Sequence, residues 1–517
     1  MIRTDHHHRV FRASEIRNLD EATIRETGIP GDVLMEVAGF QAARVIMDRQ
    51  KSKKRGLIVC GKGNNAGDAL VVARYLARNG FQLTLFFAGG TDGLSPDAAV
   101  NYERLKKSVA EYGNLNHSNV RNGPGAVNET GSLEPVNSRD VDFAVDGLFG
   151  TGLNKEIRGT YRDAITFLNN LDTTVYAMDI PSGLDSDTGG IYGVVVEAAV
   201  TCTFGGYKHG FYTPDGFRFS GDIVLCELPF PEHRYPSDKT TLIHPDLTPI
   251  PQIGKQKGKH KYERGIVYII GGSPGLTGAP VLSARSAWKA GPGAVVVITP
   301  GGLLPVFEKN LIEPVKKPVG TADDVTFGSA HIDRVLEIIH DKPGVVLLGP
   351  GIGRNNETVV FVNEIIRRAE VPLVIDADGL WCLSQAGALP AFGQQTVLTP
   401  HPGELQQLCG KPSKTSMDRL EQAKRISTDT GAMVAAKGCP VYITGSDSGT
   451  FMTGYDTTVF GRSGFGDVLA GKIAAAMSVG HDPDAAVIYA LLDGINKYQY
   501  TVSSNSSETF PGPSDIL

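Results

Sequence analysis

The stretch of residues 463–471, SGFGDVLAG, combines a glycine turn, an aspartate and an apolar run. Gly464 and Gly466 permit a tight turn with positive φ, and the residues after Asp467 predict a buried helix. Such a turn directs free backbone N–H groups at one spot, where the helix dipole adds positive potential. The segment therefore predicts an anion-binding hole beside a carboxylate, although Asp467 could equally serve as a helix cap.

Five more motifs precede this segment in the second half of the chain. They are GIVYIIGGSPGLTGAP (265–280), LGPGIG (348–353), LVIDADGL (373–380), LTPHPGEL (398–405) and AAKGCPV (435–441). Phosphoryl transfer needs anion-stabilising donors, a cation near the phosphates and a base for the attacking hydroxyl. We expect Asp467 to be the base and Glu404 to act on Mg²⁺ through water.

This ordered set resembles the carbohydrate-kinase-like NAD(P)HX dehydratases of the ribokinase-like superfamily, over roughly residues 253–498. In that family a nucleotide phosphorylates the C6 hydroxyl of the S form of hydrated NAD(P)H, and phosphate elimination restores NAD(P)H. The resemblance implies ADP, or ATP, as phosphate donor. It implies hydrate contacts at Ala279, Gly351, His401 and Asp467, and adenine nucleotide contacts at Lys437, Gly438, Cys439, Pro440, Val441 and Gly466.

A second glycine turn lies in the first half of the chain, where GKGNNAGD (61–68) follows an apolar run. A predicted helix starts at Ala69, so the layout is that of a nucleotide phosphate site. Asp146 and Asp179 stand at the ends of two further predicted strands, and Ser182 follows shortly after. The carboxyl ends of parallel strands share one edge of a sheet. We therefore expect a polar ligand there, beside a hard cation held by Asn, Asp and Ser oxygens.

Four motifs in order, GKGNNAGD, VDFAVDGLFGTGL (141–153), MDIPSGL (178–184) and TFGGYKHG (203–210), resemble the NAD(P)HX epimerase domain of the YjeF N-terminal family. The resemblance covers roughly residues 11–228. It implies that Asp179 is the acid/base that interconverts the R and S hydrates, and that potassium binds at Asn65, Asp146 and Ser182. The implied substrate contacts are Asn64, Asn65, Ala66, Gly67, Asp68, Gly150, Thr151, Gly152, Leu153, Asn154, Lys155, Glu156 and Asp179.

Several positions depart from the family patterns, among them Ala66, Ala69 and Phe465. Ala66 and Ala69 replace two glycines of the first loop, and a methyl group at Ala66 is tolerated only if φ is negative there. Phe465 replaces a small residue within the predicted anion hole, where its bulk could narrow the approach.

Apolar strands alternate with helical patterns in both halves, which indicates parallel sheets covered on both faces. We expect two three-layer α/β/α domains: a Rossmann-like domain over residues 1–230 and a ribokinase-like domain over residues 252–505. The proline-rich residues 231–251 read as a linker, residues 108–138 as a surface loop, and the residues after Thr501 as a loosely ordered tail.

Composition limits the partners. A net charge of −6 and a pI near 6.1 give no electrostatic case for nucleic acid or an anionic membrane. No apolar stretch reaches about 18 residues, so no membrane span is expected, and the cytosol is the expected location. The six scattered cysteines are expected to be reduced core residues. We also expect a homo-oligomer, stray metal binding at most for His6–His8, and a loop or linker for the basic residues 255–261.

Two alternatives to a bifunctional repair enzyme stay open. The second domain could be a small-molecule kinase for a sugar or vitamin alcohol. The altered loops could instead mark a partly inactive, nucleotide-sensing homologue. Asp146, Asp179, His401 and Asp467 argue against the sensor, because decayed sites tend to lose their ionisable groups.

Overall fold

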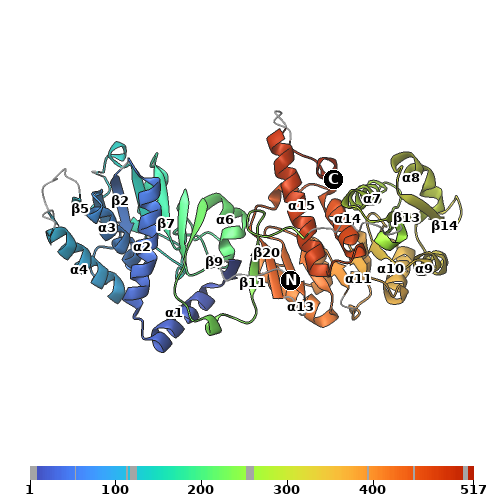
Figure 1. Cartoon of the computed structure of the whole chain (residues 1–517), viewed down its shortest axis with the longest axis horizontal. Helices are drawn as coiled ribbons and strands as arrows, with labels where there is room; N and C mark the ends of the chain where they lie inside the picture. Colours follow the sequence, from blue (N-terminus) through green and yellow to red (C-terminus); the bar gives the residue numbers. More distant parts are fainter. Residues whose placement is uncertain are drawn as a thin grey trace. The chain divides into compact units, whose positions relative to one another are not determined.

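The computed structural model describes residues 8–52, 54–111, 115–116, 125–134, 136–251, 261–392, 395–445, 449–504 and 510–517. The chain divides into two compact units, residues 4–239 and residues 240–517 (Figure 1). His6, His7 and most of the basic stretch 255–261 lie outside the described residues. Within the described part, no helix is long and apolar enough to cross a bilayer.

The N-terminal unit is built on a sheet in which every pair of neighbouring strands is parallel. In order across the sheet, the strands are β10 (Asp222–Cys226), β8 (Val200–Phe204), β7 (Thr174–Met178), β6 (Phe143–Gly147), β2 (Arg55–Cys60), β3 (Gln82–Phe87), β5 (Val127–Thr130) and β4 (Leu115–Asn116). Separately, β1 (Arg9–Phe11) pairs in parallel with β9 (Tyr207–Lys208).

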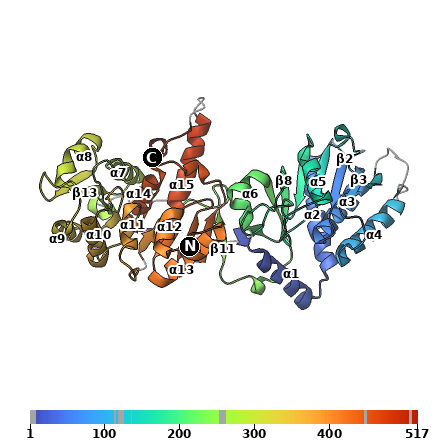
Figure 2. The ribbon, with the colours of Figure 1, turned by 180° about the vertical axis from the view of Figure 1, so that it is seen from behind.

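Helices cover both faces of this sheet (Figure 2). One apolar cluster joins the sheet to α2 (Gly31–Arg49), α3 (Asn64–Arg78) and α4 (Pro96–Glu111). A second cluster joins the other face to α5 (Thr160–Asn169) and to the segment around Val196. The helices α1 (Ala13–Thr27) and α6 (Pro214–Phe219) complete the unit.

Two expectations for this unit are wrong in detail. Helix α3 begins at Asn64, not Ala69, so Asn64–Asp68 form the first turns of the helix. Ala66 is therefore helical, and its methyl group is fully buried without a positive φ. Residues 108–138 are not one loop, because Val127–Thr130 pair with β3 as strand β5. Of this stretch, residues 112–114, 117–124 and 135 lie outside the described residues.

The C-terminal unit contains a longer sheet. Its strands, in order, are β14 (Val315–Val319), β13 (Ala294–Pro300), β12 (Ile266–Ile270), β15 (Val345–Leu348), β16 (Leu373–Ile375), β17 (Thr396–Leu398), β18 (Met433–Ala436), β19 (Tyr442–Gly445), β20 (Gly449–Thr453) and β11 (Thr240–Ile243). Only β19 runs antiparallel to its neighbours.

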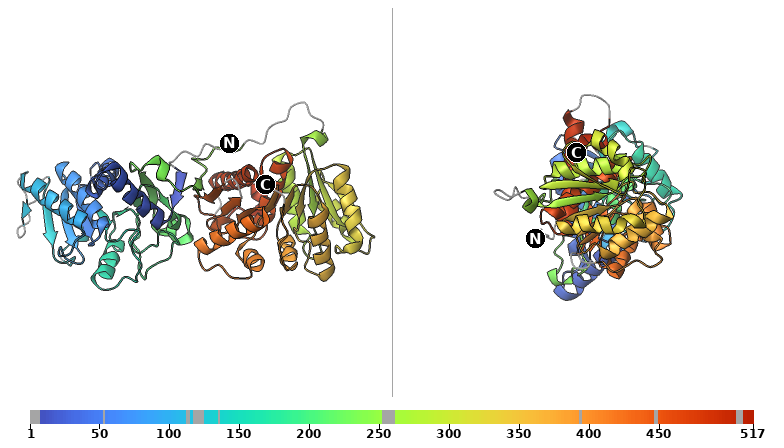
Figure 3. Two further views of the ribbon diagram at one scale, coloured as in Figure 1. Left: turned by 90° about the horizontal axis from the view of Figure 1, so that it is seen from below. Right: turned by 90° about the vertical axis from the view of Figure 1, so that its right-hand side faces the viewer.

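Two helical layers enclose this sheet (Figure 3). The helices α7 (Gly278–Ala290), α8 (Leu304–Asn310), α14 (Phe465–Ser478) and α15 (Pro483–Ser504) share one large apolar cluster with the strands. A consecutive series forms the other layer: α9 (Ile332–Asp341), α10 (Asn356–Arg368), α11 (Asp378–Ser384), α12 (Pro402–Cys409) and α13 (Ser416–Thr430). The expected three-layer α/β/α organisation is confirmed for both units.

The ends of the C-terminal unit are more ordered than the sequence suggested. The proposed linker contains strand β11, which pairs with β20. Beyond the end of α15, residues 513–516 form a short 3₁₀ helix, and Ile516 is only 3% exposed. The tail is therefore packed against the domain, because an apolar side chain and a buried lysine hold it there.

In both units the chemistry-bearing motifs follow adjacent strands. Residues 61–68, Asp146 and Asp179 follow or end β2, β6 and β7. In the other unit, the motifs follow β12, β15, β16, β17 and β18, which are neighbours in that order. Since all of these strands are parallel, each motif set gathers at one edge of its sheet.

Candidate active sites

The N-terminal motifs line a cavity of about 900 Å³. Those of the predicted substrate contacts that line it are Asn64, Asn65, Asp68, Gly150, Thr151, Gly152, Leu153, Asn154, Lys155, Glu156 and Asp179. Ala66 and Gly67 are buried within α3 and do not line the cavity. A cavity of this size is adequate for a nucleotide-sized ligand.

Asp179 is held at this cavity by a buried lysine. Lys208 is fully buried, and its Nζ lies 2.5 Å from Asp179 Oδ1 and 2.6 Å from Thr203 Oγ1. Asp179 also has a positive φ of 63°, a strained conformation for a residue with a side chain. Lys208 is absent from the sequence-based set, although it stands in the TFGGYKHG motif. The pairing of β9 with β1 places it here.

Two further carboxyl groups face Asp179. Burial raises the pKa of Asp20 to about 6, and the charge of Asp179 adds to the effect. Burial likewise raises the pKa of Asp68 well above its ordinary value, again with a contribution from Asp179. The site therefore combines an ion-paired carboxylate with two buried carboxyl groups whose pKa values are raised, a combination that suits acid/base chemistry.

Of the residues predicted to hold potassium, Asn65 lines the cavity, whereas Asp146 and Ser182 do not. Asp146 accepts hydrogen bonds from Ser182 N at 2.8 Å and from Ser182 Oγ at 2.7 Å, and both residues are fully buried. Asn65 Nδ2 donates to the carbonyl oxygen of Phe149 at 3.0 Å. Asn65 Oδ1 is buried without a hydrogen-bond partner, so the acceptor capacity of this oxygen is unused.

The C-terminal motifs line a second cavity, of about 660 Å³. Of the predicted contacts, those lining it are His401, Lys437, Gly438, Cys439, Val441, Gly466 and Asp467. Pro440, Ala279 and Gly351 do not line it. Ala279 and Gly351 follow β12 and β15 at the edge of the sheet where the other motifs of this unit lie.

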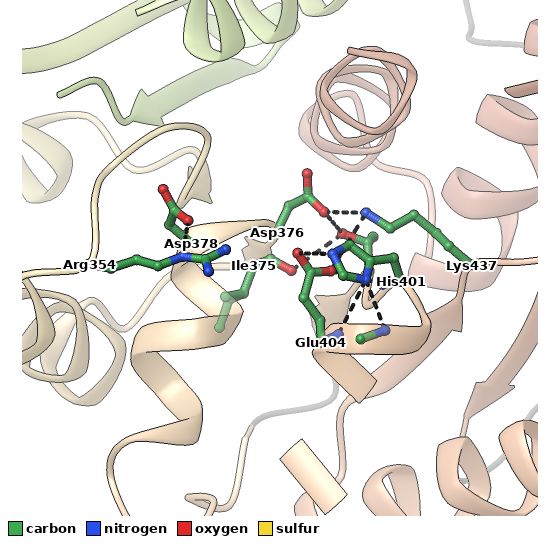
Figure 4. A network of polar contacts seen from close by, with 9 residues as sticks. Arg354, Ile375, Asp376, Asp378, His401, Glu404 and Lys437 are labelled. Carbon is green, nitrogen blue, oxygen red and sulfur yellow. Dashed lines mark hydrogen bonds and ion pairs between the residues drawn. The ribbon is translucent and has the colours of Figure 1, made fainter. Parts of the chain in front are cut away.

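A network of polar contacts spans this site (Figure 4). Asp376 Oδ1 accepts from Lys437 Nζ at 2.8 Å and from Thr399 Oγ1 at 2.6 Å. Burial alone would lower the pKa of Lys437, but Asp376 and Glu404 outweigh it and the pKa is raised. Lys437 is therefore a permanent cation in the cavity wall, suited to an anionic ligand.

His401 and Glu404 form the start of helix α12. His401 Nδ1 accepts from Gly403 N at 3.0 Å, and Glu404 Oε2 accepts from His401 N at 2.8 Å. This is a reciprocal capping arrangement. Burial raises the pKa of Glu404 to about 7 and lowers the pKa of His401, with Lys437 contributing to the latter. The capping role thus fixes both side chains in the cavity wall.

The anion hole takes a different form from the one expected. Helix α14 begins at Phe465, so Gly464 is the N-cap residue and Asp467 the third helical residue. Of the two glycines expected to form the turn, Gly464 has a positive φ, of 98°, whereas Gly466 lies within the helix. The helix-cap alternative for Asp467 is therefore wrong. The first N–H groups of α14 still lack intrahelical partners and open onto the cavity.

Asp467 itself has the protonation behaviour of a base. Burial raises its pKa to about 7, Asp376 adds to the increase, and Lys437 opposes it. Phe465 lines the same cavity, but its ring is only 4% exposed and packs edge-on against Phe460, with ring centroids 5.3 Å apart. Most of the phenyl group therefore belongs to the apolar core.

Comparisons with known proteins match both units of the chain. The family described as YjeF-related protein N-terminus matches residues 31–210, and the NAD(P)H-hydrate dehydratase family matches residues 267–493. A bifunctional NAD(P)H-hydrate repair enzyme of Thermofilum pendens is 31% identical over 93% of this chain and 89% of its own length. The Salinibacter ruber enzyme is 32% identical over 93% of this chain and 90% of its own length.

Among solved structures, the ADP/ATP-dependent NAD(P)H-hydrate dehydratase of Bacillus subtilis, co-crystallised with ATP and Mg²⁺, shares 20% identity at a TM-score of 0.42. It matches 51% of this chain and 90% of its own length. The two family matches and the full-length relatives cover both units in the same order. The chain belongs to the family of bifunctional NAD(P)H-hydrate repair enzymes.

Proposed function

We propose that this chain repairs hydrated NAD(P)H with two active sites. The unit expected over residues 1–230 interconverts the R and S hydrates, and the unit expected over residues 252–505 dehydrates the S form at the expense of ADP or ATP. The proposal rests on the presence of two cavities in one chain. Each cavity is lined by its own acid/base residues and its own anion-binding residues. The alternatives, a small-molecule kinase or a sensor without turnover, remain outcomes of the experiments below.

In the epimerase site, Asp179 is the group proposed to exchange protons with the hydrate. Its carboxylate is fixed by Lys208, so the oxygen that is not ion-paired is available toward the cavity. Asp68 and Asp20 line the same cavity, and because burial raises the pKa of each, they are the proposed proton donors. When a proton donor and a proton acceptor of the protein contact the same ligand, a proton can be added to it and removed from it reversibly, as epimerisation requires.

Potassium is proposed at Asn65, Asp146 and Ser182. The support is the buried oxygen Oδ1 of Asn65, which has no hydrogen-bond partner. Asn65 Nδ2 and Ser182 Oγ both contact the carbonyl oxygen of Phe149, and Ser182 Oγ also contacts Asp146. Hard cations prefer such oxygen ligands. When bound, the ion would neutralise Asp146 and add positive charge beside the substrate cavity. Within the described residues, no group of three or more His, Cys, Asp or Glu side chains could hold a metal.

In the dehydratase site, Asp467 is the proposed base. It would accept the proton of the C6 hydroxyl as that oxygen attacks the terminal phosphoryl group of the nucleotide. The free N–H groups of α14 and the cation Lys437 would stabilise the phosphoryl oxygens. Phosphate then leaves C6 and a proton is lost from C5, which forms the C5–C6 double bond and restores NAD(P)H.

The nucleotide is proposed to lie against Lys437–Val441 and Gly466, and the hydrate against Ala279, Gly351 and His401. The acidic residues Asp376 and Glu404 fit Mg²⁺, because both are carboxylates buried beside this cavity. When bound, the ion would neutralise charge on the phosphates, and Glu404 would reach it through water.

The test mixes the purified chain with R,S-NADHX and either ADP or ATP, and follows NADH absorbance at its maximum. We expect complete recovery of NADH with one of the nucleotides, since epimerisation feeds the R form into the dehydratase. Recovery that stops at the S fraction would refute the epimerase function. No recovery with either nucleotide would refute the dehydratase function, and nucleotide-induced thermal stabilisation without turnover would support a sensor.

A cytosolic location and a homo-oligomeric state stay predictions. None of the six cysteines, which all lie within the described residues, forms a disulfide, which is compatible with a reducing compartment. Sedimentation of the purified chain would test the oligomeric state.

A further inference from the structure

The C-terminal segment of residues 511–516 lies against the dehydratase cavity, although none of the six motifs includes it. Ile516 lines the cavity together with Phe465 and Asp467. Its side chain is 3% exposed and belongs to the main apolar cluster of the unit. The segment is therefore part of the cavity wall.

Two basic residues hold this segment in place. Lys472, on helix α14, donates from Nζ to the carbonyl oxygen of Ile516 at 2.9 Å. Arg462, which precedes the anion-hole turn, donates from Nη2 to the carbonyl oxygen of Pro511 at 2.6 Å. One end of the segment is thus attached to helix α14, and the other end is attached to the residue before the anion-hole turn.

The anchor at Lys472 is an unusual residue for its position. Lys472 is 1% exposed and stands between Gly471 and Ile473, within the otherwise apolar residues 468–477 of helix α14. Asp493 Oδ2, 2.7 Å away, is its ion-pair partner. Burying a lysine is costly unless it is paired and hydrogen-bonded. The carbonyl of Ile516 supplies one of these bonds, so the segment and the buried charge stabilise each other.

The segment also contacts the turn directly. Gly464 has no side chain, and a Cβ atom placed there would lie 2.9 Å from Pro513 Cγ. The ring of Pro513 therefore packs against the backbone of the N-cap residue whose positive φ starts helix α14. A displaced segment would remove this support from the turn.

We propose that residues 511–516 are a positioning and specificity element of the nucleotide site. Ile516 forms part of the apolar wall, and the segment holds the Ser463–Gly464 turn so that the N–H groups of α14 point at the phosphates. This inference rests on the proposed dehydratase function. It assigns no proton transfer to Ile516 or Lys472.

The test uses Ile516→Asp in the full-length chain, with Ile516→Leu as the conservative variant. Tyr500→Asp is the matched control, because Tyr500 is 74% exposed on α15 and receives the same acidic group. We expect Ile516→Asp to raise the nucleotide KM at least tenfold and the hydrate KM less than threefold. The leucine variant should raise the nucleotide KM less than the aspartate variant does, and the Tyr500→Asp control should stay within twofold of the parent. The epimerase rate of the same chain serves as an internal standard for intact protein.

An unchanged nucleotide KM, or an equal rise in both KM values, would overturn the proposal. If Ile516→Asp fails to fold, hydrogen exchange of the parent chain with and without ADP decides. Protection of residues 510–517 together with 462–467 supports the inference, whereas protection of 462–467 alone refutes it. Protection of neither segment, with no NADH recovered, would instead refute the dehydratase function itself.

Discussion

Replacing Asp467 by asparagine removes the proposed base while keeping the size of the side chain. A general base contributes roughly 10²–10⁴-fold to a rate. We therefore expect kcat of the dehydratase to fall by at least about 100-fold. The KM for the hydrate should change little, because asparagine can still accept a hydrogen bond from the hydroxyl. The epimerase rate should be unaffected, since Asp467 belongs to the other cavity.

The same substitution should stabilise the protein, and the effect should depend on pH. Burial raises the pKa of Asp467 from 3.8 to about 7, so the folded state prefers the protonated carboxyl. This pKa difference corresponds to a change of at most about 4 kcal/mol in the free energy of unfolding. The stability that goes with the protonated form is complete below pH 3.8 and is lost as pH rises through about 7. The gain from asparagine should thus be small at pH 4.5 and reach its full size at pH 8.

Three measurements check this reasoning. The parent should show kcat/KM for the hydrate rising with pH through an apparent pKa of about 7, as expected for a base with that pKa. Thermal unfolding of Asp467→Asn and of the parent at pH 4.5 and pH 8 gives the stability difference. A variant that keeps more than a tenth of the parent kcat would refute the role of Asp467 as base. A stability gain that is equal at both pH values would refute the burial argument.

Other substitutions test the remaining assignments. Lys208→Met should lower the epimerase rate at least tenfold and leave the dehydratase unchanged, because it leaves Asp179 without its buried partner; an unaltered epimerase rate would contradict that pairing's role. Asp146→Asn should abolish any stimulation of the epimerase by K⁺ over Na⁺, and persistence of that stimulation would place the ion elsewhere. Gly464→Ala should destabilise the dehydratase unit by about 1–3 kcal/mol and raise the nucleotide KM, since φ is 98° there; equal melting curves and KM values would argue against a strained turn.

Much of the fold follows from local pattern. The short runs GLIVC (56–60), FAV (143–145) and TVL (396–398) lie within the observed β2, β6 and β17. Each is a short run of apolar residues, and a strand buried on both faces requires such a run. The starts of helices were less predictable. Both α3 and α14 begin earlier than expected, because glycine within the first helical turn gives no signal of helix.

Some expectations failed because polar or sparse sequence can still be ordered by distant partners. Val127–Thr130 pairs with β3 although its surroundings read as a loop. Thr240–Ile243 forms a strand inside the proposed linker, because β20 offers an unpaired edge. The C-terminal residues are ordered by Lys472 and by the apolar cluster around Ile516. In each case the ordering partner lies far away in the sequence, so no local pattern records it.

The sequence by itself determined the two α/β units, the order of the motifs and the family to which the chain belongs. Glycine turns, strand-end aspartates and apolar runs are local properties, and local properties are what a sequence displays directly. Tertiary structure alone decided which side chains meet. It brought Lys208 to Asp179, raised the pKa of Asp467 by burial and excluded its role as a helix cap. These outcomes depend on distances and desolvation between residues far apart in the chain, and only folding creates them.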